Sequence, residues 1–591
     1  MKERTARIGV ALLALLLAIS CLICFVPSAV SAAEEEEDYN TARPGVFYVS
    51  PDGNDANDGK TMDTAWKSLS FAAYYMGAKG FDEVQTVLVA DGVYYEAAEI
   101  KPNGVIGTKE QPAVFKSINK WGAKIISTSP YHGVCICNCQ YFVFDGFHLD
   151  FPEEKNHHFG ILAFSDNVGT KVSNHITIRN CIITNAPSSG IQANGTDNVI
   201  IENNMVFKNA LKEDGNNGSG ISVYEPKASP AEAEADDNEW GIVVRNNYLW
   251  QNNCLYPCPG FSFQTDGNGI IIDDYRWSQN GSKYPYTKET LVENNLIFDN
   301  GGRGIHVFIS DNVTIRNNTV YKNGWTVMQH NAYGNGINLE QGSGCTVYNN
   351  LVISLDEPES TALNDSNKDT VYYNNVVVGT VKINGLNAFP EGSQGNQILG
   401  KDKIADVSLY NPSNDLVFLN FSPREGSMLL NAGYTQAGAP ADDITGAARD
   451  LSDGVTIGAY ETGSEAYGIP TDFFDHYQAE GGIVSFRTPS KYTDKVGNPM
   501  AEYSAVKIGA DTMIASLFEA NNEINCKSVS LYLKKVEGKF NVAVYSDNNG
   551  ELGLKLSETG LQNGVSEEKQ YTYDLDKTVS VKEGDKIWIA L

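Results

Sequence analysis

The chain has 591 residues, of which 44 are Lys or Arg and 73 are Asp or Glu, so its formal net charge is −29. With 42% hydrophobic residues it can bury a large core, which excludes an acidic disordered tail. The acidity argues against nucleic acid or an anionic membrane surface as partner, because either requires clustered Lys and Arg. The 55 glycines, 21 prolines and recurrent asparagines are typical of many tight turns and predict an all-β protein.

The first 32 residues have the layout of a secretory signal peptide. Basic residues precede an apolar run from Ile8 to Val26, and small residues at 30–32 follow it. We therefore expect a secreted or cell-surface protein without a transmembrane segment in its mature part. A retained membrane anchor would need a longer stop-transfer pattern with basic flanks. Residues 33–43 form an acidic linker in this interpretation.

Two of the ten cysteines lie in the predicted signal peptide, and the remaining eight are too few for a disulfide scaffold in a chain of this length. Cys135, Cys137 and Cys139 alternate, so we expect them to share one face of a strand. Small buried core residues are favoured there over a metal cluster, because no CxxC spacing accompanies them. A loop disulfide between Cys254 and Cys258 stays open.

A short phrase recurs through the middle of the chain, in which Ile or Val is followed by any residue and then by Asn. Its copies are Ile178-Arg179-Asn180, Ile201-Glu202-Asn203, Val244-Arg245-Asn246, Val292-Glu293-Asn294 and Ile315-Arg316-Asn317. The shortest spacing is 23 residues, which predicts a parallel β-solenoid with one coil per repeat. Longer spacings indicate loops inserted into a coil.

Two further sets of residues keep a constant distance from these phrases. Six residues after the repeat asparagine come Asn209, Asn252, Asn300 and Asn323, which we expect to form a ladder of stacked amides. Another equivalent position holds Phe207, Trp250, Phe298 and Tyr321. We expect these four to form an aromatic stack in the core rather than a platform for sugars.

A second strand in each coil begins with Gly-Ile. Counted from that glycine, positions +1 and +3 are apolar and are expected to face the core; they are Ile191/Ala193, Ile221/Val223, Ile270/Ile272, Ile305/Val307 and Ile337/Leu339. Positions +2 and +4 must then face outward; they are Gln192/Asn194, Ser222/Tyr224, Ile271/Asp273, His306/Phe308 and Asn338/Glu340. A ridge of polar and aromatic side chains is typical of a carbohydrate groove.

The domain order follows from where the repeats begin and end. Residues 44–462 form the predicted β-helix, and a helix over Ala65–Met76 covers its open end. The oxygen-rich run Asp52–Gly59 favours an Asn/Asp turn over a structural Ca²⁺ site, because it lacks the closing Glu of a calcium loop. Residues 463–591 show short alternating strands typical of a β-sandwich accessory domain, and the strand-like end of the sequence indicates a truncated domain.

Three carboxylates lie around one strand of the predicted groove, in the segment Thr265-Asp266-Gly267-Asn268-Gly269-Ile270-Ile271-Ile272-Asp273-Asp274. Hydrolysis of a glycosidic bond needs two carboxyl groups. One is an acid that protonates the leaving oxygen, and the other is a nucleophile or a base that activates water. A retaining enzyme holds them about 5–5.5 Å apart, whereas seven residues of straight strand span roughly 23 Å. Gly267 and Gly269 must therefore fold the chain back. Crowding by Asp274 and burial should raise the pKa of one carboxyl.

This ten-residue segment resembles the catalytic segment of the lacto-N-biosidase family of retaining glycoside hydrolases, which are built on a right-handed parallel β-helix. The order of signal peptide, β-helix and β-sandwich is similar too. The resemblance implies release of lacto-N-biose, Gal-β-1,3-GlcNAc, from human milk oligosaccharides such as lacto-N-tetraose or from mucin-type glycans. It implies Asp266 as acid/base and Asp273 as nucleophile, with no required cofactor and no catalytic metal. Gln264, Asp274, Arg303, His306 and Tyr224 are candidates for binding the sugar.

Two other classes of function remain open at this point. A polysaccharide lyase or epimerase needs Ca²⁺ or basic residues against a uronate, together with a Lys, Arg or His base, and Arg303 keeps this alternative open. A non-catalytic carbohydrate-binding surface protein is the other. Loss of hydrolysis in Asp273→Ala with binding retained would identify an enzyme, and unsaturated products would identify a lyase.

Overall fold

The computed structural model describes residues 39–79, 85–101, 107–151, 159–166, 172–211, 218–229, 240–254, 257, 264–281, 283–326, 336–412, 419–452, 454–461, 469–470, 472–473, 476, 515–519, 524–533, 539–548, 551–564, 569–581 and 586–590. The chain divides into two compact units, Met1–Pro412 with Asn420–Ala466, and Ser413–Leu419 with Tyr467–Leu591. The predicted signal peptide lies outside the described residues, so it stays a prediction.

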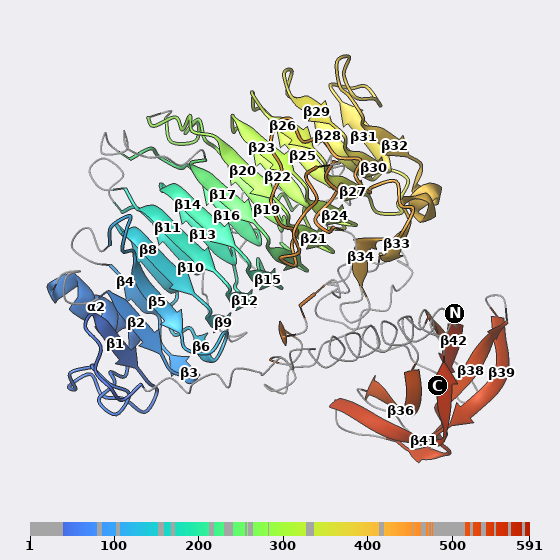
Figure 1. Ribbon diagram of the computed structural model, residues 1–591, viewed down its shortest axis with the longest axis horizontal. Coiled ribbons are helices and arrows are strands. Elements are labelled where there is room, and N and C mark those ends of the chain that lie inside the picture. The colour runs from blue at the N-terminus through green and yellow to red at the C-terminus, as the bar shows by residue number, and fades with distance from the viewer. Residues whose placement is uncertain are drawn as a thin grey trace, which may run out of the picture. The chain divides into compact units, whose positions relative to one another are not determined.

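The first unit is a right-handed parallel β-helix, as predicted, in which each coil adds one strand to each of three long parallel sheets (Figure 1). Sheet 1 has 11 strands in the order β1 (Val46–Val49), β2 (Thr86–Val89), β5 (Ala113–Ser117), β8 (Gln140–Asp145), β11 (Asn174–Arg179), β14 (Asp197–Glu202), β17 (Ile242–Arg245), β20 (Thr290–Glu293), β23 (Val313–Arg316), β26 (Thr346–Tyr348) and β29 (Val371–Tyr373).

Sheet 2 has 10 strands and carries the candidate site. Its strands are β4 (Ala98–Ile100), β7 (His132–Cys137), β10 (Phe159–Phe164), β13 (Ile191–Asn194), β16 (Ile221–Tyr224), β19 (Ile270–Asp273), β22 (Ile305–Phe308), β25 (Ile337–Glu340), β28 (Thr361–Asp365) and β31 (Thr380–Ile383).

Sheet 3 has 11 strands and closes the coil. Its strands are β3 (Gly92–Tyr95), β6 (Ala123–Ile126), β9 (His148–Asp150), β12 (Ile182–Thr184), β15 (Met205–Phe207), β18 (Tyr248–Trp250), β21 (Leu296–Phe298), β24 (Thr319–Tyr321), β27 (Leu351–Ile353), β30 (Val376–Val378) and β32 (Gln397–Leu399). After these come a 3-10 helix, η3 (Lys401–Val407), and the antiparallel pair β33 (Leu409–Asn411) and β34 (Asn420–Pro423).

The helix α2 (Leu69–Lys79) lies at the first coil and buries one face against the core (Figure 1). Its core residues have helical spacing: Leu69, Ala72, Ala73 and Met76. The helix begins later than predicted because Trp66 pairs with the extended Val49. Glu96 then accepts hydrogen bonds from the first free backbone N–H groups of the helix, at Leu69 (2.9 Å) and Ser70 (3.2 Å).

The side chains of sheet 2 alternate as the sequence predicted. The +1 and +3 residues of every Gly-Ile strand belong to the hydrophobic core, among them Ile270 and Ile272 of β19. Each strand pairs in register with the next, so Tyr224, Asp273 and Phe308 follow one another on the outer face. This face is where the candidate site lies.

The predicted asparagine ladder is confirmed and has a parallel companion. Asn252 Nδ2 donates to Asn300 Oδ1 at 2.9 Å, and Asn300 Nδ2 donates to Asn323 Oδ1 at 2.8 Å, all three side chains being buried. The second ladder runs through Asn204, Asn247, Asn295, Asn318, Asn350, Asn375 and Asn396. Residues next to the ladder positions take the left-handed conformation, for example Asn246 (φ 55°) and Gln251 (φ 54°).

The predicted aromatic stack forms, but it lies outside the central core. Phe207 and Trp250 stack with ring centroids 4.3 Å apart, and Phe298 follows at 5.8 Å. These side chains point away from the coil interior, since the neighbouring Val206 and Leu249 belong to the core. Phe421 packs against the end of the stack, so a later segment of the chain contributes to its burial.

The prediction that three alternating cysteines share one face is wrong for Cys139. Strand β7 ends at Cys137, and Asn138 takes the left-handed conformation with φ 56°. This turn directs Cys139 into the hydrophobic core, whereas Cys135 pairs in register with the outward-facing Glu99. Cys258 lies outside the described residues, so its pairing with Cys254 stays untested.

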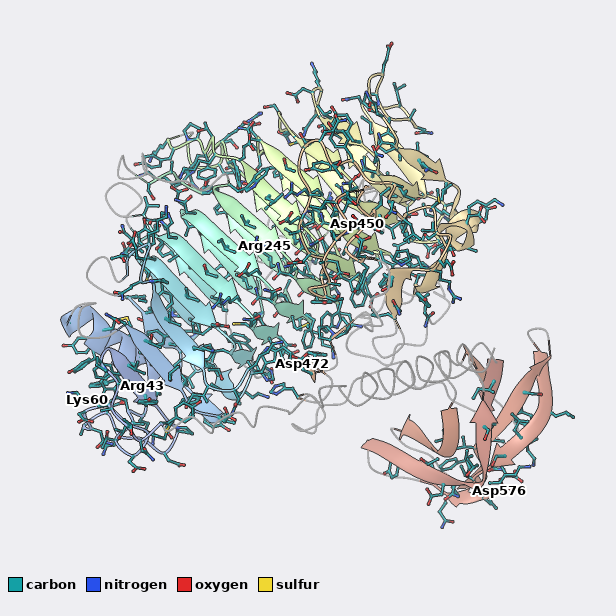
Figure 2. All side chains as sticks on the ribbon, viewed as in Figure 1. Arg43, Lys60, Arg245, Asp450, Asp472 and Asp576 are labelled. Carbon is teal, nitrogen blue, oxygen red and sulfur yellow. The ribbon has the colours of Figure 1, made fainter. Side chains whose placement is uncertain are left out.

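The middle residues of the repeated phrase, together with Asp145 on the preceding strand, form a ladder of alternating charge along sheet 1. In register order its members are Asp145, Arg179, Glu202, Arg245, Glu293 and Arg316. Arg245, labelled in Figure 2, pairs with Glu202 at 2.7 Å, and Arg316 Nε donates to Glu293 at 2.7 Å. Opposite charges on neighbouring strands stabilise this pairing and disfavour a shift of register.

The second unit consists of antiparallel strands. They are β35 (Ala515–Glu519), β36 (Ile524–Leu533), β37 (Lys539–Phe540), β38 (Ala543–Asn548), β39 (Glu551–Glu558), β40 (Gln562–Asn563), β41 (Lys569–Val581) and β42 (Lys586–Ala590). A four-stranded sheet has the order β35-β42-β38-β39, and β36 pairs with β41. Val544 of the sheet and Val529 of the pair share one apolar cluster. None of the helices among the described residues is long and apolar enough to cross a membrane.

Candidate active site

The predicted acidic segment approaches and then forms β19. Gly267 has φ +82°, so the chain turns there, and an added Cβ would lie 2.4 Å from the backbone nitrogen of Cys254. Gly269 does not adopt the left-handed conformation. It is needed for packing, because a Cβ there would lie 2.4 Å from the Ile297 side chain. One of the two predicted turn glycines therefore turns the chain, and the other lets two coils pack closely.

Asp266 lies before this turn, and a buried amide holds its carboxylate. Thr265 Oγ1 donates to Asp266 Oδ2 at 2.6 Å, and Asn268 Nδ2 donates to Asp266 Oδ1 at 3.3 Å. Asn268 is fully buried; its Nδ2 also donates to Ser219, and its Oδ1 accepts the backbone N–H of Arg303 at 2.9 Å. Bonds to two neighbouring coils thus fix the orientation of the Asn268 amide toward Asp266.

Asp273 ends β19 on the outer face, between Tyr224 of β16 and Phe308 of β22. Burial raises the pKa of its carboxyl to about 8, and the charges of Asp266, Asp274 and Glu225 raise it further. Its Oδ1 is buried and forms no hydrogen bond with any described residue. Asp273 therefore carries a proton at neutral pH. The predicted combination of burial and crowding thus acts on this carboxyl.

Asp274 has a different role from the sugar binding that the sequence predicted. Its side chain is fully buried, with φ 49°. The backbone N–H and hydroxyl of Ser278 each donate to its Oδ1 at 2.8 Å, and the backbone N–H of Gln279 donates to its Oδ2 at 2.8 Å. Because both oxygens bind the turn that follows β19, Asp274 holds that turn and is not available to a sugar.

Tyr224 is half-buried one strand before Asp273, and its hydroxyl lies 3.4 Å from Gln279 Oε1. Burial, followed by the charges of Glu225 and Asp273, raises the pKa of its phenol above the ordinary value, so the hydroxyl stays a donor. Gln264 is half-buried two residues before Asp266, on the same approach to the site. Both predicted sugar-binding residues thus lie beside the aspartates.

Arg303 and His306 lie on the following coil. Arg303 is buried and donates through Nη1 to the Thr265 carbonyl oxygen at 3.0 Å. Burial and then the charge of Arg303 lower the pKa of His306 to about 4, so this imidazole is neutral at pH 7. Glu340 on β25 lies 3.9 Å from His306 Nε2. Burial opposes its ionisation, but His306 and Arg303 lower the pKa of Glu340 to about 2.

Three residues of this region were absent from the sequence-based site. Asn268 orients Asp266, Glu340 balances the charge of Arg303, and Glu225 adds charge beside Asp273. Glu340 occupies the +4 position two coils after Asp273, so the ridge pattern could have identified it. Glu225 follows the outward Tyr224 directly, and only its left-handed conformation (φ 45°) turns it toward the acidic group.

The oxygen-rich loop at 52–59 is built from turns. Asp55 Oδ1 accepts the backbone N–H groups of Lys67 (2.8 Å) and Ser68 (3.0 Å), and Asp58 Oδ1 accepts that of Lys60. Within the part of the chain that the structure describes, no group of three or more His, Cys, Asp or Glu side chains could hold a metal ion. The carboxylate oxygens of Asp55 and Asp58 accept backbone N–H groups, which is the pattern of an Asn/Asp turn.

Comparison with known protein families confirms the fold. The family model described as the right-handed beta helix region matches residues 166–376, and this range includes every residue of the candidate site. No curated protein matches the sequence.

Solved structures with a similar fold have different activities. Pectate lyase Pel9A is 13% identical, with 71% of this chain and 97% of that chain covered and a TM-score of 0.39. A GH136 lacto-N-biosidase from Eubacterium ramulus is 18% identical, with 60% of this chain and 59% of that chain covered and a TM-score of 0.33. The A-module of mannuronan C-5 epimerase AlgE6 from Azotobacter vinelandii is 14% identical, with 56% of this chain and 89% of that chain covered and a TM-score of 0.35. These similarities concern the fold alone.

Proposed function

We propose that this protein is a secreted or cell-surface retaining glycoside hydrolase that releases lacto-N-biose from lacto-N-tetraose or from mucin-type glycans. The observation that carries the proposal is the asymmetry of two carboxyls that lie close enough for the charge of Asp266 to raise the pKa of Asp273. Asp273, whose pKa is raised to about 8, holds a proton at neutral pH, and its Oδ1 has no hydrogen-bond partner among the described residues, whereas Asp266 accepts hydrogen bonds on both oxygens. Such a pair, holding one proton, meets the requirement of double displacement.

The reaction needs the shared proton on the acid and a charge on the nucleophile. In the roles implied by the family resemblance, Asp266 protonates the leaving oxygen while Asp273 attacks the anomeric carbon. The proton of the free site is on Asp273, so it must pass to Asp266 when substrate binds. A sugar hydroxyl that donates to Asp273 Oδ1 favours the ionised form of Asp273 and promotes this transfer. Water then attacks the glycosyl ester, with Asp266 acting as the base.

The neighbouring side chains divide the task of holding the sugar. The phenol of Tyr224 and the amide of Gln264 offer hydrogen bonds beside the two aspartates. The neutral His306 can donate to or accept from a hydroxyl, since its Nδ1 has no hydrogen-bond partner among the described residues. Arg303 supplies positive charge near Asp266, and its Nη1 donates to the Thr265 carbonyl oxygen.

The test is to incubate the protein with lacto-N-tetraose and to follow the products by NMR. We expect lacto-N-biose released initially as the β-anomer, with loss of activity in Asp266→Asn and Asp273→Asn. Azide should rescue the two variants differently: the nucleophile variant yields a glycosyl azide of inverted configuration, and the acid/base variant one of retained configuration. A folded protein without released disaccharide would defeat the substrate assignment, and unsaturated products would show a lyase.

A further inference from the structure

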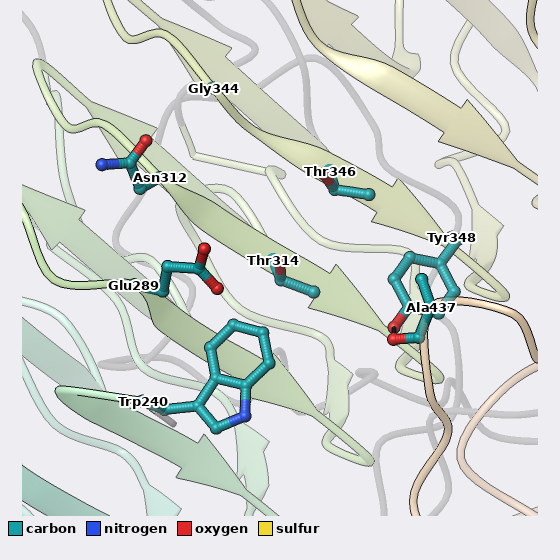
Figure 3. A pocket seen from close by; sticks show the side chains of 8 residues that line it. All are labelled: Trp240, Glu289, Asn312, Thr314, Gly344, Thr346, Tyr348 and Ala437. Carbon is teal, nitrogen blue, oxygen red and sulfur yellow. Dashed lines mark hydrogen bonds between the residues drawn. The ribbon is translucent and has the colours of Figure 1, made fainter. Parts of the chain in front are cut away.

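A pocket lies on sheet 1, whereas Asp273 lies on sheet 2. Its volume is about 230 Å³, and it spans four consecutive coils. Figure 3 shows the indole of Trp240 and the carboxylate of Glu289 on one side and Tyr348 on the other. The described residues that line it are Trp240, Glu289, Asn312, Thr314, Gly344, Thr346, Tyr348 and Ala437.

We propose that this pocket binds one neutral pyranose residue of a glycan and thereby forms a second carbohydrate site. The proposal is independent of the hydrolase reaction at Asp266 and Asp273. It rests on three features: an aromatic wall, polar groups that face the pocket, and the sign of the charge.

The aromatic wall is Trp240, which precedes β17 and is half-buried. The guanidinium of Arg316 lies 5.9 Å from its ring centroid, so a fixed cation holds the indole from one side. Arg316 is itself fixed, because its Nε donates to Glu293 at 2.7 Å and its Nη1 donates to Tyr348 Oη at 3.0 Å. A rigid, partly exposed indole is the kind of surface on which the C–H face of a sugar ring packs.

The opposite wall comes from a distant part of the chain. Tyr348 Oη donates to the carbonyl oxygens of Ala437 (2.9 Å) and Gly438 (3.1 Å), which fixes residues 437–438 beside β26. Between the walls, the hydroxyls of Thr314 and Thr346 and the carboxylate of Glu289 have no hydrogen-bond partner among the described residues. These groups can donate to and accept from the hydroxyls of a sugar.

The charge of the pocket selects against acidic sugars. Among the described residues that line the pocket, Glu289 is the only charged one, and none of them is Lys, Arg or His. A uronate or a phosphate placed there would meet the Glu289 carboxylate, while the nearby Arg316 is already paired with Glu293. The volume is below the ~300–1,000 Å³ usual for larger ligands, which fits a single ring better than several. A neutral hexose or N-acetylhexosamine residue is therefore the expected occupant.

The experiment measures binding to the intact protein in an Asp273→Asn background, which removes hydrolysis. The probes are lacto-N-tetraose, maltotetraose and tetragalacturonate, and the readouts are calorimetric stoichiometry and ligand-detected NMR. We expect at least one neutral tetrasaccharide to bind at a site that Trp240→Ala weakens by about tenfold or more, while tetragalacturonate does not bind there. Trp240→Phe should retain most of the affinity, and Tyr74→Ala, which removes an aromatic ring that is 71% exposed on α2, should change nothing.

The outcomes separate this proposal from the hydrolase. With Asp273 intact, Trp240→Ala should leave hydrolysis of a small aryl lacto-N-bioside unchanged. If every neutral probe binds the Trp240→Ala protein as tightly and in the same number as the parent, the pocket is not a sugar site. Equal binding of tetragalacturonate at the Trp240 site overturns the neutral-sugar assignment. If the protein does not hydrolyse lacto-N-tetraose but binds a neutral tetrasaccharide at Trp240, the proposed activity is wrong and the sugar pocket is supported.

Discussion

The Nδ2 of Asn268 lies 3.3 Å from Oδ1 of Asp266, and the Oδ1 of the same amide accepts the backbone N–H of Arg303 at 2.9 Å. The orientation of a candidate catalytic carboxylate is thus linked to the backbone of the next coil. Asn268 acts as a positioning residue, because its fully buried side chain touches Asp266 and does not reach the outer face.

Replacing this amide should therefore impair catalysis more than binding. We expect Asn268→Ala to lower kcat by about 10- to 100-fold with little change in KM, and to move the pH dependence of kcat. The measurement is a set of pH–rate profiles on an aryl lacto-N-bioside. Asn350→Ala is the matched control, since Asn350 is also fully buried and its Oδ1 also accepts a backbone N–H of a neighbouring coil, that of Asn318, at 3.0 Å. An unchanged profile in Asn268→Ala would show that the amide serves only the coil.

The pH profile of the parent protein should report the shared proton. The pair is active while it holds one proton, and the pKa of Asp273 is raised to about 8. We therefore expect kcat/KM to decline as pH rises through about 8, because the pair then loses that proton. Glu225→Gln should move this limb to lower pH, since it removes a charge that raises the pKa of Asp273. A limb that stays in place would exclude Asp273 as its source.

Asp273 should also lower the stability of the fold at neutral pH. Its folded pKa of about 8 lies above the unfolded value, so the folded state retains a proton that the unfolded state loses. The cost is absent below about pH 4, grows as pH rises, and is complete above about pH 8. We expect Asp273→Asn to raise the free energy of unfolding by on the order of 2–3 kcal/mol at pH 8 and by little at pH 4. Urea titrations at both pH values provide the check, and equal gains at both would contradict the assignment.

Asp274, in contrast to Asp273, should stabilise the fold. Its carboxylate accepts three hydrogen bonds from the turn at Ser278 and Gln279 while buried. Asp274→Ala should lower the free energy of unfolding by about 2–3 kcal/mol, because two backbone donors lose their partner. Any loss of sugar affinity should be small beside that change. A variant of unchanged stability but strongly weakened sugar binding would restore the direct contact that the sequence suggested.

The charge ladder of sheet 1 gives a prediction far from either site. Arg245 lies between Glu202 and Glu293, so Arg245→Glu would place three like charges on neighbouring strands. We expect a loss of about 1 kcal/mol, which salt reduces, because the Arg245 side chain is 40% exposed. Arg245→Gln, which removes the attraction without adding a like charge, should lose less stability and depend less on salt. Melting temperatures at low and high salt measure both effects.

The coil architecture could be predicted from the sequence because its signals are local and repeated. The Gly-Ile strands, the asparagine ladders and the aromatic positions each recur at a constant place in the coil, so one coil specifies the next. The predictions went wrong where the chain leaves that period. Asn138 turns Cys139 into the core, and the pairing of Trp66 with Val49 delays the start of α2. The stacked rings are buried as predicted, but they lie outside the central cluster, where Phe421 helps to cover them.

The net charge of −29 and the repeats alone determined that this is an all-β solenoid with acidic residues on an outer strand. The sequence also placed Asp266 and Asp273 in one segment. Only the tertiary structure decided which carboxyl holds the proton, because burial and the charges of Asp274 and Glu225 act through space. Only the tertiary structure shows that Asp274 binds the turn after β19. It also shows that Ala437 lies beside Tyr348 at the pocket on sheet 1. Coil periodicity is encoded locally, whereas the protonation state and the pocket depend on contacts between residues far apart in the chain.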